Sequence, residues 1–283
     1  MAMREIDVSR VTEKVKELFL TANYEIGPDI EAAVTGAAAA EPSPTGRAVL
    51  CQLCENYQIA RQERVAICQD TGMAVLFLDI GQDVHFTGGG FEQAVQEGVR
   101  QAYREGYLRK SVVNDPLFDR KNTGDNTPAL LYPRIVPGEE VRILVTAKGF
   151  GSENMSAVKM CTPSEGEAGV REFIIDTARK AGPNPCPPMI LGVGIGGTME
   201  QAALLAKRMT ARPVGSQNPD PRYAQLEADC LAAINRLGIG PAGIGGKTTA
   251  LAVNIAFAPT HIAGMPVAVN ICCHAARHAE GVL

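Results

Sequence analysis

The chain has 283 residues, which is long enough for one large domain or two smaller ones. Its composition, 46% hydrophobic and 20% charged, is that of an ordinary globular protein, and its formal net charge is −4. The negative charge and the singly scattered basic residues argue against nucleic acid or an acidic membrane surface as the main partner. No segment approaches the roughly 18 apolar residues of a membrane span, and the charged N-terminus lacks the apolar core of a signal peptide, so we expect a cytoplasmic protein with reduced cysteines.

The first part of the chain is predicted to be helical. Apolar residues repeat at helical spacing along residues 8–21. Pro28 is a suitable first-turn residue for a second helix, and a third helix is expected over residues 47–62. Residues 1–62 are therefore predicted to form a helical N-terminal segment.

From residue 63 onward, short apolar runs bounded by glycine, proline or polar residues predict buried strands. These runs are AVLFLDI, VRILVTA, MILGVGI, ALAVNIAFA and MPVAVNI, and helices are expected at 91–107, 167–181, 199–211 and 222–237. The segment VLFLDIGQDVHFTGGG is predicted to form a β-hairpin. The predicted fold class is mixed α/β (α+β). Short mixed sheets covered by helices make up a body over residues 63–283, which forms one structural unit with the N-terminal helices.

Two glycine-rich segments resemble phosphate-binding loops without matching them. GVGIGGT follows a predicted strand, but its glycine spacing differs from the dinucleotide-binding pattern. A tight turn and an anion site at the following helix N-terminus both fit it, and Thr198 with Gln201 is expected to form a capping box. GIGGKTT would need a glycine where Pro241 stands, which argues against a nucleoside triphosphate site; Lys247 then either is exposed or faces an acidic ligand.

Four of the eight cysteines are interpreted as packing residues. Cys51 and Cys54 have the C-x-x-C spacing of many metal sites, yet both lie within a helical pattern, and no second C-x-x-C follows to complete a site. Cys161 and Cys230 are interpreted as small buried side chains.

Three other cysteines stand at predicted strand ends. Cys68 lies beside an amide and a carboxylate in CQDTG, Cys186 is held between prolines in NPCPP, and Cys272 or Cys273 ends the last strand. Three thiolates can hold an iron–sulfur cluster and leave one iron with an open position, as in a catalytic metal site. The alternative is three unrelated thiols.

A local zinc site is a further alternative. Cys272, Cys273, His274 and His278 lie close together in the sequence, and histidines at positions i and i+4 share one face of a helix.

Seven short motifs point to a known family. CQDTG, FTGGG, NTGDNTPA, KGFGS, NPCPP, GIGGT and GIGGKT occur in an order that resembles class I, iron–sulfur-dependent fumarases and the related L-tartrate dehydratases, from about residue 65 to the C-terminus. The resemblance implies a hydro-lyase that adds water to fumarate to give L-malate and uses an oxygen-labile 4Fe–4S cluster.

The resemblance also implies roles for individual residues. The cluster ligands of the family correspond to Cys68, Cys186 and, by its distance from Arg277, Cys273 rather than Cys272. Asp70 corresponds to a candidate proton-transfer residue. The positions that contact the dicarboxylate substrate correspond to Gln69, Arg109, Gly151 and His261.

Two departures from the single-chain members of the family carry further expectations. This chain reads KGFGSENM where those members read KGGGSANK, so conversion of tartrate to oxaloacetate stays an alternative to hydration of fumarate. Single-chain members continue into a second domain that completes the active site, whereas this chain ends at Leu283. The resemblance therefore implies an α subunit completed by a separate β subunit, as α2β2. A non-catalytic zinc-binding assembly protein is the alternative from another class.

Overall fold

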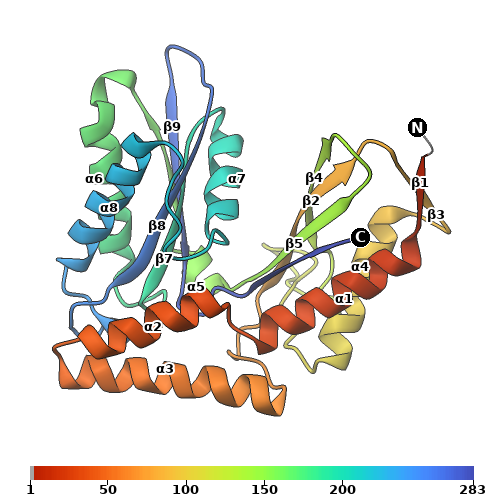
Figure 1. Ribbon diagram of the computed structural model, residues 1–283, viewed down its shortest axis with the longest axis horizontal. Coiled ribbons are helices and arrows are strands. Elements are labelled where there is room, and N and C mark those ends of the chain that lie inside the picture. Colours follow the sequence, from red (N-terminus) through yellow and green to blue (C-terminus); the bar gives the residue numbers. More distant parts are fainter. Residues whose placement is uncertain (1–2) are drawn as a thin grey trace. The chain divides into compact units, whose positions relative to one another are not determined.

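The computed structural model describes residues 3–283, which divide into two compact units. The first unit consists of the chain up to Gly27, Tyr57–Gly149 and Arg277–Leu283, and the second consists of Pro28–Asn56 and Phe150–Ala276. Each unit combines helices with a mixed sheet (Figure 1), which confirms the predicted α+β class.

The first unit is built on a four-stranded sheet. Its strand order is β10 (His278–Val282), β5 (Val141–Lys148), β2 (Met73–Gly81) and β4 (Leu130–Val136). β2 runs parallel to β4 and antiparallel to β5, and β5 runs antiparallel to β10. These directions make it a mixed sheet.

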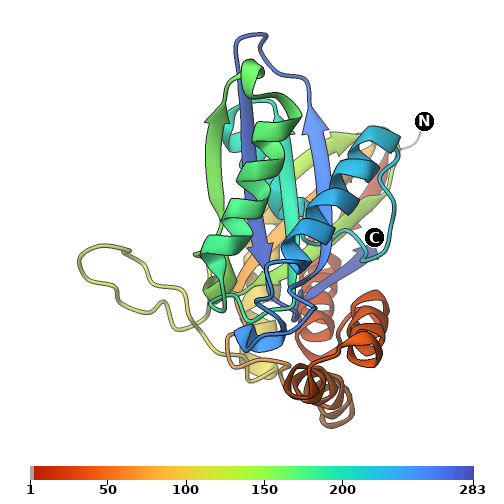
Figure 2. The ribbon, with the colours of Figure 1, turned by 90° about the vertical axis from the view of Figure 1, so that its left-hand side faces the viewer.

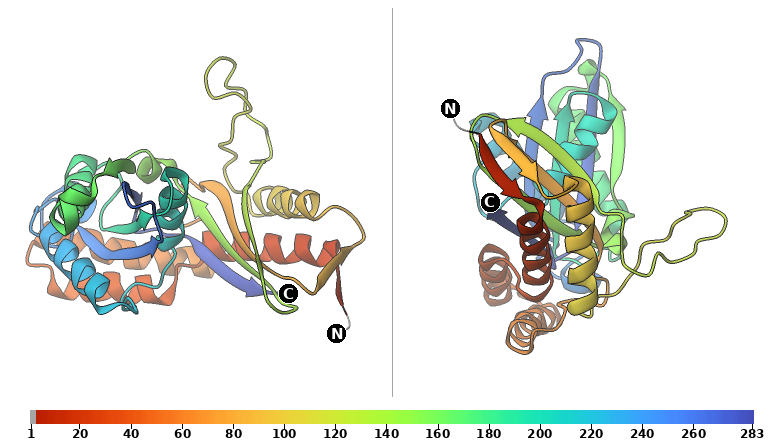
Figure 3. Two further views of the ribbon diagram at one scale, coloured as in Figure 1. Left: turned by 90° about the horizontal axis from the view of Figure 1, so that it is seen from above. Right: turned by 90° about the vertical axis from the view of Figure 1, so that its right-hand side faces the viewer.

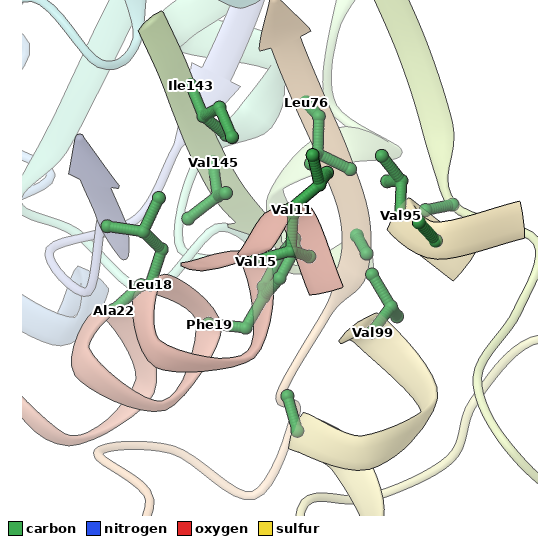
Figure 4. Packing of buried hydrophobic residues seen from close by; sticks show 14 of the residues in the cluster. Val11, Val15, Leu18, Phe19, Ala22, Leu76, Val95, Val99, Ile143 and Val145 are labelled. Carbon is green, nitrogen blue, oxygen red and sulfur yellow. The ribbon is translucent and has the colours of Figure 1, made fainter. Parts of the chain in front are cut away.

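Two helices of the first unit, α1 (Val8–Tyr24) and α4 (Phe91–Glu105), pack side by side (Figure 3). Figure 4 shows their apolar side chains, among them Val15 and Val99, meeting Leu76 of β2 and Ile143 of β5 in one core. Because Val8, Val11, Val15 and Leu18 recur at helical spacing, α1 buries a single continuous face against the sheet.

The predicted β-hairpin after residue 74 is wrong. β3 (Val84–Thr87) pairs in parallel with β1 (Arg4–Asp7) and not with β2. The reason is that β2 is a central strand, and its two edges are already hydrogen-bonded to β4 and β5.

The second unit has a sheet covered by helices on both faces. Its strand order is β6 (Ala157–Cys161), β9 (Met265–Cys272), β7 (Met189–Gly196) and β8 (Ala250–Ala258). Figure 2 shows α6 and α8 in front of this sheet and α7 behind it. The helices of this unit are α2 (Pro28–Ala40), α5 (Phe150–Glu153), α6 (Gly166–Ala181), α7 (Met199–Met209) and α8 (Pro221–Asn235), with short 3-10 turns at Pro163–Glu165 and Pro241–Gly243. Helix α3 (Pro44–Glu63) contributes residues to both units.

The predicted helices and the five predicted strands are confirmed, with ends that differ by a few residues. The strands of the two four-stranded sheets that the apolar runs did not indicate are β4, β6 and β10. Each lies at the edge of its sheet and exposes part of its side chains, so none of them carries a continuous apolar run. Within residues 3–283, no helix is long and apolar enough to cross a membrane.

The GVGIGGT segment serves close packing between β7 and α7. A Cβ atom placed on Gly194 would lie 2.0 Å from the carbonyl oxygen of Ala202, and one on Gly192 would lie 2.0 Å from that of Ala206. Only glycine permits this approach of strand to helix. Thr198 makes no side-chain capping hydrogen bond to α7, so the predicted capping box is wrong.

The GIGGKTT segment binds a carboxylate of the chain itself. Glu41 has no exposed surface, and its carboxylate accepts hydrogen bonds from the backbone N–H groups of Ser43, Lys247 and Thr248, at 2.9 to 3.2 Å. Burial by itself raises the pKa of Glu41, but the backbone hydrogen bonds outweigh it and hold that pKa below its usual value. The phosphate-loop-like segment therefore ties the end of α2 to the beginning of β8.

We predict that Glu41→Gln lowers the free energy of unfolding at pH 7 by about 1–3 kcal/mol, because an amide cannot accept all the hydrogen bonds that the carboxylate accepts. Since the pKa of Glu41 is lowered by folding, its contribution is present at neutral pH and is lost as the pH falls through the folded-state pKa. Urea denaturation at pH 7 and at decreasing pH should show the difference from wild type shrinking in acid. Glu55→Gln, on the exposed face of α3, is the control, and an equal loss in both variants would contradict the prediction.

Candidate active site

The CQDTG motif forms a turn that enters β2 in the first unit. The Asp70 carboxylate accepts a hydrogen bond from the Gly72 N–H at 2.9 Å, and the Cys68 thiol donates to the Gln69 amide oxygen at 3.4 Å. Gly72 has a φ of +74°, and a Cβ atom there would lie 2.7 Å from the backbone of Ala147, so this position requires glycine. Cys68 and Asp70 are partly buried and Gln69 is exposed.

A tyrosine of helix α4 hydrogen-bonds to the backbone of this turn. Tyr103 is fully buried. Its hydroxyl donates a hydrogen bond that is shared between the carbonyl oxygens of Thr71, at 2.7 Å, and Gly72, at 3.1 Å. Burial raises the pKa of Tyr103, so the hydroxyl stays protonated and keeps donating at neutral pH. The Thr71 hydroxyl in turn donates to the carbonyl oxygen of Arg109 at 2.9 Å, while the Arg109 residue is exposed. The structure thus places Asp70 and Arg109 on adjoining backbone segments.

Two buried cations adjoin the same turn, and the sequence analysis assigned neither of them to the site. Arg277 is 2% exposed, and its Nη1 donates to the main-chain carbonyl of Asp70. Lys148 is 1% exposed, and its Nζ donates to the carbonyl oxygen of Gly149 at 3.2 Å. A Cβ atom on Gly149 would lie 3.1 Å from Oδ2 of Asp70 and 3.2 Å from Nη2 of Arg277, so carboxylate and guanidinium converge on this glycine. A lysine ending a buried strand is the sequence signal that could have indicated Lys148.

In the second unit, Cys186 and Cys273 lie at the same end of the sheet. Cys186 precedes β7 in an exposed loop with a φ of +53°, and Cys273 follows β9. β7 and β9 are antiparallel neighbours in which Ile190 pairs with Cys272. Cys272 is buried inside β9, whereas Cys273 is partly exposed, so Cys273 is the more accessible thiol of the pair.

Gly151 and His261 lie at opposite ends of the second unit. A Cβ atom on Gly151 would lie 3.8 Å from the carbonyl oxygen of Asn184, so Gly151 adjoins the loop that carries Cys186. His261 is exposed in the connection between β8 and β9, with Nδ1 accepting from the Ala263 N–H at 3.2 Å. The length of β9 therefore separates His261 from Cys273 within this unit, and a shared role for the two residues stays a prediction.

The described residues contain no ready-made site for a single metal ion. Within residues 3–283, no group of three or more His, Cys, Asp or Glu side chains could hold one. The chain after Cys272 is irregular and then extended as β10, so the helix on which His274 and His278 were expected to share a face is absent there. The premise of the local zinc site is wrong.

Of the four cysteines that were interpreted as packing residues, Cys161 and Cys230 are confirmed. Cys161 and Cys230 are buried, and burial raises the pKa of both thiols, that of Cys230 to about 12. Cys51 and Cys54 lie on α3. Cys51 is exposed, so its interpretation as a packing residue is wrong, whereas Cys54 is partly buried and contacts the Thr35 hydroxyl at 3.6 Å.

In the first unit a carboxylate and two cationic side chains lie at a turn next to a strand end, and in the second unit two partly accessible thiols lie at one end of a sheet. Polar and nucleophilic side chains in such turns are typical of enzymes. Comparison with known proteins names the class. The family model described as fumarate hydratase (Fumerase) matches residues 12–282, nearly the whole chain. The chain therefore belongs to the fumarate hydratase family, a family of hydro-lyases.

Individual relatives cover almost the whole chain. A Methanocaldococcus jannaschii protein named "Putative L(+)-tartrate dehydratase subunit alpha" is 38% identical over 277 residues, which are 95% of this chain and 96% of the relative. Proteins named L(+)-tartrate dehydratase subunit alpha from Escherichia coli UTI89 and Shigella sonnei are each 31% identical over 280 residues, which are 98% of this chain and 91% of those relatives. The resemblance inferred from the motifs is confirmed at the level of the family.

We predict an order of alkylation for the thiols of the metal-free chain. Cys186 should react with iodoacetamide before Cys161 and Cys230, because a thiol must be both accessible and deprotonated to react. Within the peptide that contains both, Cys273 should be modified before Cys272. Timed alkylation followed by peptide mass spectrometry measures this order. Modification of Cys272 first would contradict the assignment of Cys273 as the accessible thiol.

Proposed function

We propose that this chain is the α subunit of a 4Fe–4S hydro-lyase that reversibly hydrates fumarate to L-malate. One observation carries the proposal: Cys68, Cys186 and Cys273 lie in turns next to strand ends with part of their surface accessible, whereas Cys161, Cys230 and Cys272, inside strands or a helix, are buried. Membership of the fumarate hydratase family supports the reaction class.

The donor set fits an iron–sulfur cluster. Cysteine thiolates are the usual ligands of such clusters, and these three are the cysteines that the family motifs indicate. When bound, a 4Fe–4S cluster held by three thiolates supplies an iron with an open position, which acts as a Lewis acid toward a substrate oxygen.

The chain's own polar groups would bind the dicarboxylate. The exposed Arg109 can hold one substrate carboxylate through two parallel N–H···O hydrogen bonds, which its planar guanidinium matches. The Gln69 amide and the backbone N–H at Gly151 are proposed as further donors. His261 was also expected to contact the substrate, but within one chain it lies a strand's length from Gly151, so this contact is not part of the proposal. Asp70, oriented by the Gly72 N–H, is proposed to transfer the proton at the substrate carbon.

L(+)-Tartrate is a second candidate substrate, converted to oxaloacetate by loss of water. The relatives described above carry this substrate in their names, and tartrate differs from malate by one further hydroxyl. A site that hydrogen-bonds this hydroxyl would discriminate strongly against the substrate that lacks it.

A separate β subunit is the proposed partner, in an α2β2 assembly. The relatives are named as alpha subunits, which supports a second kind of chain. The direct test is anaerobic reconstitution of the chain with iron and sulfide, addition of the β subunit, and assay with fumarate and with L(+)-tartrate. The larger kcat/KM identifies the substrate, and activity with neither would refute the hydro-lyase.

We predict that Cys68→Ser and Cys186→Ser each abolish the broad visible absorbance of the reconstituted chain, because serine does not replace a thiolate ligand. Cys51→Ser and Cys230→Ser should keep about four irons per chain and the absorbance that a 4Fe–4S cluster gives. Iron, acid-labile sulfide and the visible spectrum are measured before and after exposure to air. Equal loss in all four variants would show that these cysteines stabilise the fold instead of binding the cluster.

We predict that Arg109→Ala raises KM for the dicarboxylate by roughly 10- to 100-fold at unchanged iron content, the effect of losing about 1.5–3 kcal/mol of charged hydrogen bonding. Arg104→Ala, which removes another exposed arginine near the end of α4, is the control and should leave KM unchanged. An unaltered KM in Arg109→Ala would refute the role of Arg109 as the carboxylate ligand.

A further inference from the structure

Residues 110–127 of the first unit form an extended arm whose two ends lie together (Figure 3). Hydrogen bonds across the arm close its base: the Thr123 N–H donates to the Val112 carbonyl and the Asn114 N–H to the Lys121 carbonyl, both at 2.9 Å. The arm begins directly after Arg109 and ends in the NTGDNTPA motif, to which the sequence analysis gave no role.

Asn126 of this motif is fully buried where the two ends of the arm meet. Its Oδ1 accepts from the N–H groups of Ser111 at 2.7 Å and Val112 at 3.2 Å, and its Nδ2 donates to the carbonyl oxygen of Gly72 at 3.1 Å. Because two partners are donors and one is an acceptor, the oxygen and nitrogen of the amide are not interchangeable here. Its φ of +63° is one that asparagine tolerates better than most residues.

These three hydrogen bonds join two segments of the candidate site. The N–H of Gly72 orients the Asp70 carboxylate, and Ser111 follows Arg109 closely along the chain. A second link runs beside the first, from the Thr71 hydroxyl to the Arg109 carbonyl at 2.9 Å. The amide of Asn126 thus sets the spacing between the backbone that carries Asp70 and the backbone that carries Arg109.

A four-carbon dicarboxylate has a fixed length between the carboxylate that Arg109 would bind and the carbon at which Asp70 would act. A displacement of about 1 Å in such a pair costs on the order of 100-fold in rate. We propose that Asn126 is a positioning residue that holds Asp70 and Arg109 at the separation that the dicarboxylate requires. This inference rests on the proposed function, and it adds a residue whose amide bonds only to backbone groups of the chain.

Asn126→Asp tests one bond of the link. Aspartate keeps the two acceptor bonds to Ser111 and Val112 and tolerates a positive φ, but it places an oxygen in front of the Gly72 carbonyl in place of the amide donor. We expect kcat/KM of the reconstituted complex to fall by about 100-fold, at the iron content of wild type.

Gln96→Glu is the matched control. The Gln96 amide likewise bridges a backbone N–H and a backbone carbonyl, both of Ala129, at 2.8 and 3.3 Å, and it lies in the same unit without touching Asp70 or Arg109. The same amide-to-carboxylate change should lower the free energy of unfolding there and leave kcat/KM near the wild-type value. Equal kinetic loss in both variants would overturn the positioning role.

Amide hydrogen exchange of the full chain tests the hydrogen bonds of Asn126 without an assay of activity. In Asn126→Asp, peptides that contain residues 68–72 should exchange faster, because the hydrogen bond to the Gly72 carbonyl is lost, while residues 111 and 112 keep their acceptor. Gln96→Glu should leave both segments protected. Unchanged exchange at 68–72 would overturn the link. Complete inactivity of wild type with fumarate and tartrate would instead refute the proposed function and leave the exchange result to decide the link.

Thr71→Val covers the case in which Asn126→Asp fails to fold. This substitution removes only the parallel bond to the Arg109 carbonyl. It should weaken the same link to a smaller degree, with faster exchange at 109–112 and a lower kcat/KM. Wild-type values in both measurements would overturn the proposal.

Discussion

A guanidinium buried in the first unit constrains the turn on which the candidate site is built. Arg277 is 2% exposed, and its guanidinium stays charged in a protein. Neighbouring groups of the chain must therefore accept its hydrogen bonds in place of water. The main-chain carbonyl of Asp70, 207 positions away in the sequence, provides one, and the Arg277 carbonyl itself accepts from the Ala147 N–H. The segment leading into β10, the end of β5 and the turn before β2 are thereby held together. In this arrangement the Asp70 carboxylate and the Arg277 guanidinium both lie beside Gly149.

Three of the family motifs also make contacts within the chain. In GIGGKTT the backbone N–H groups bind the Glu41 carboxylate, and in GVGIGGT the glycines allow α7 to approach β7 closely. NTGDNTPA places Asn126 between the CQDTG turn and the Arg109 segment. In the structure these motifs make contacts within the chain. They hold in place the shorter motifs that carry thiols, carboxylate and guanidinium.

The elements of the fold were largely predictable, and the pairing of strands was not. Helical spacing of Val8, Val11 and Val15 predicted α1 because burial of one helix face imposes that spacing locally. The partner of β3 depended on whether the edges of β2 were already taken, which is a property of the whole sheet. The edge strands β4, β6 and β10 could not be recognised either, because they bury only part of their side chains and therefore contain no continuous apolar run.

By itself the sequence determined the family, the element types and the residue types of the candidate site, because order and spacing of short motifs are properties of the linear chain. Only the tertiary structure decided which thiols are accessible and at which end of the second unit's sheet Cys186, Cys273 and His261 lie. It also showed that Arg277, Tyr103 and Asn126 hydrogen-bond to the Asp70 turn. Burial and long-range hydrogen bonds depend on residues far apart along the chain, so no local pattern contains them.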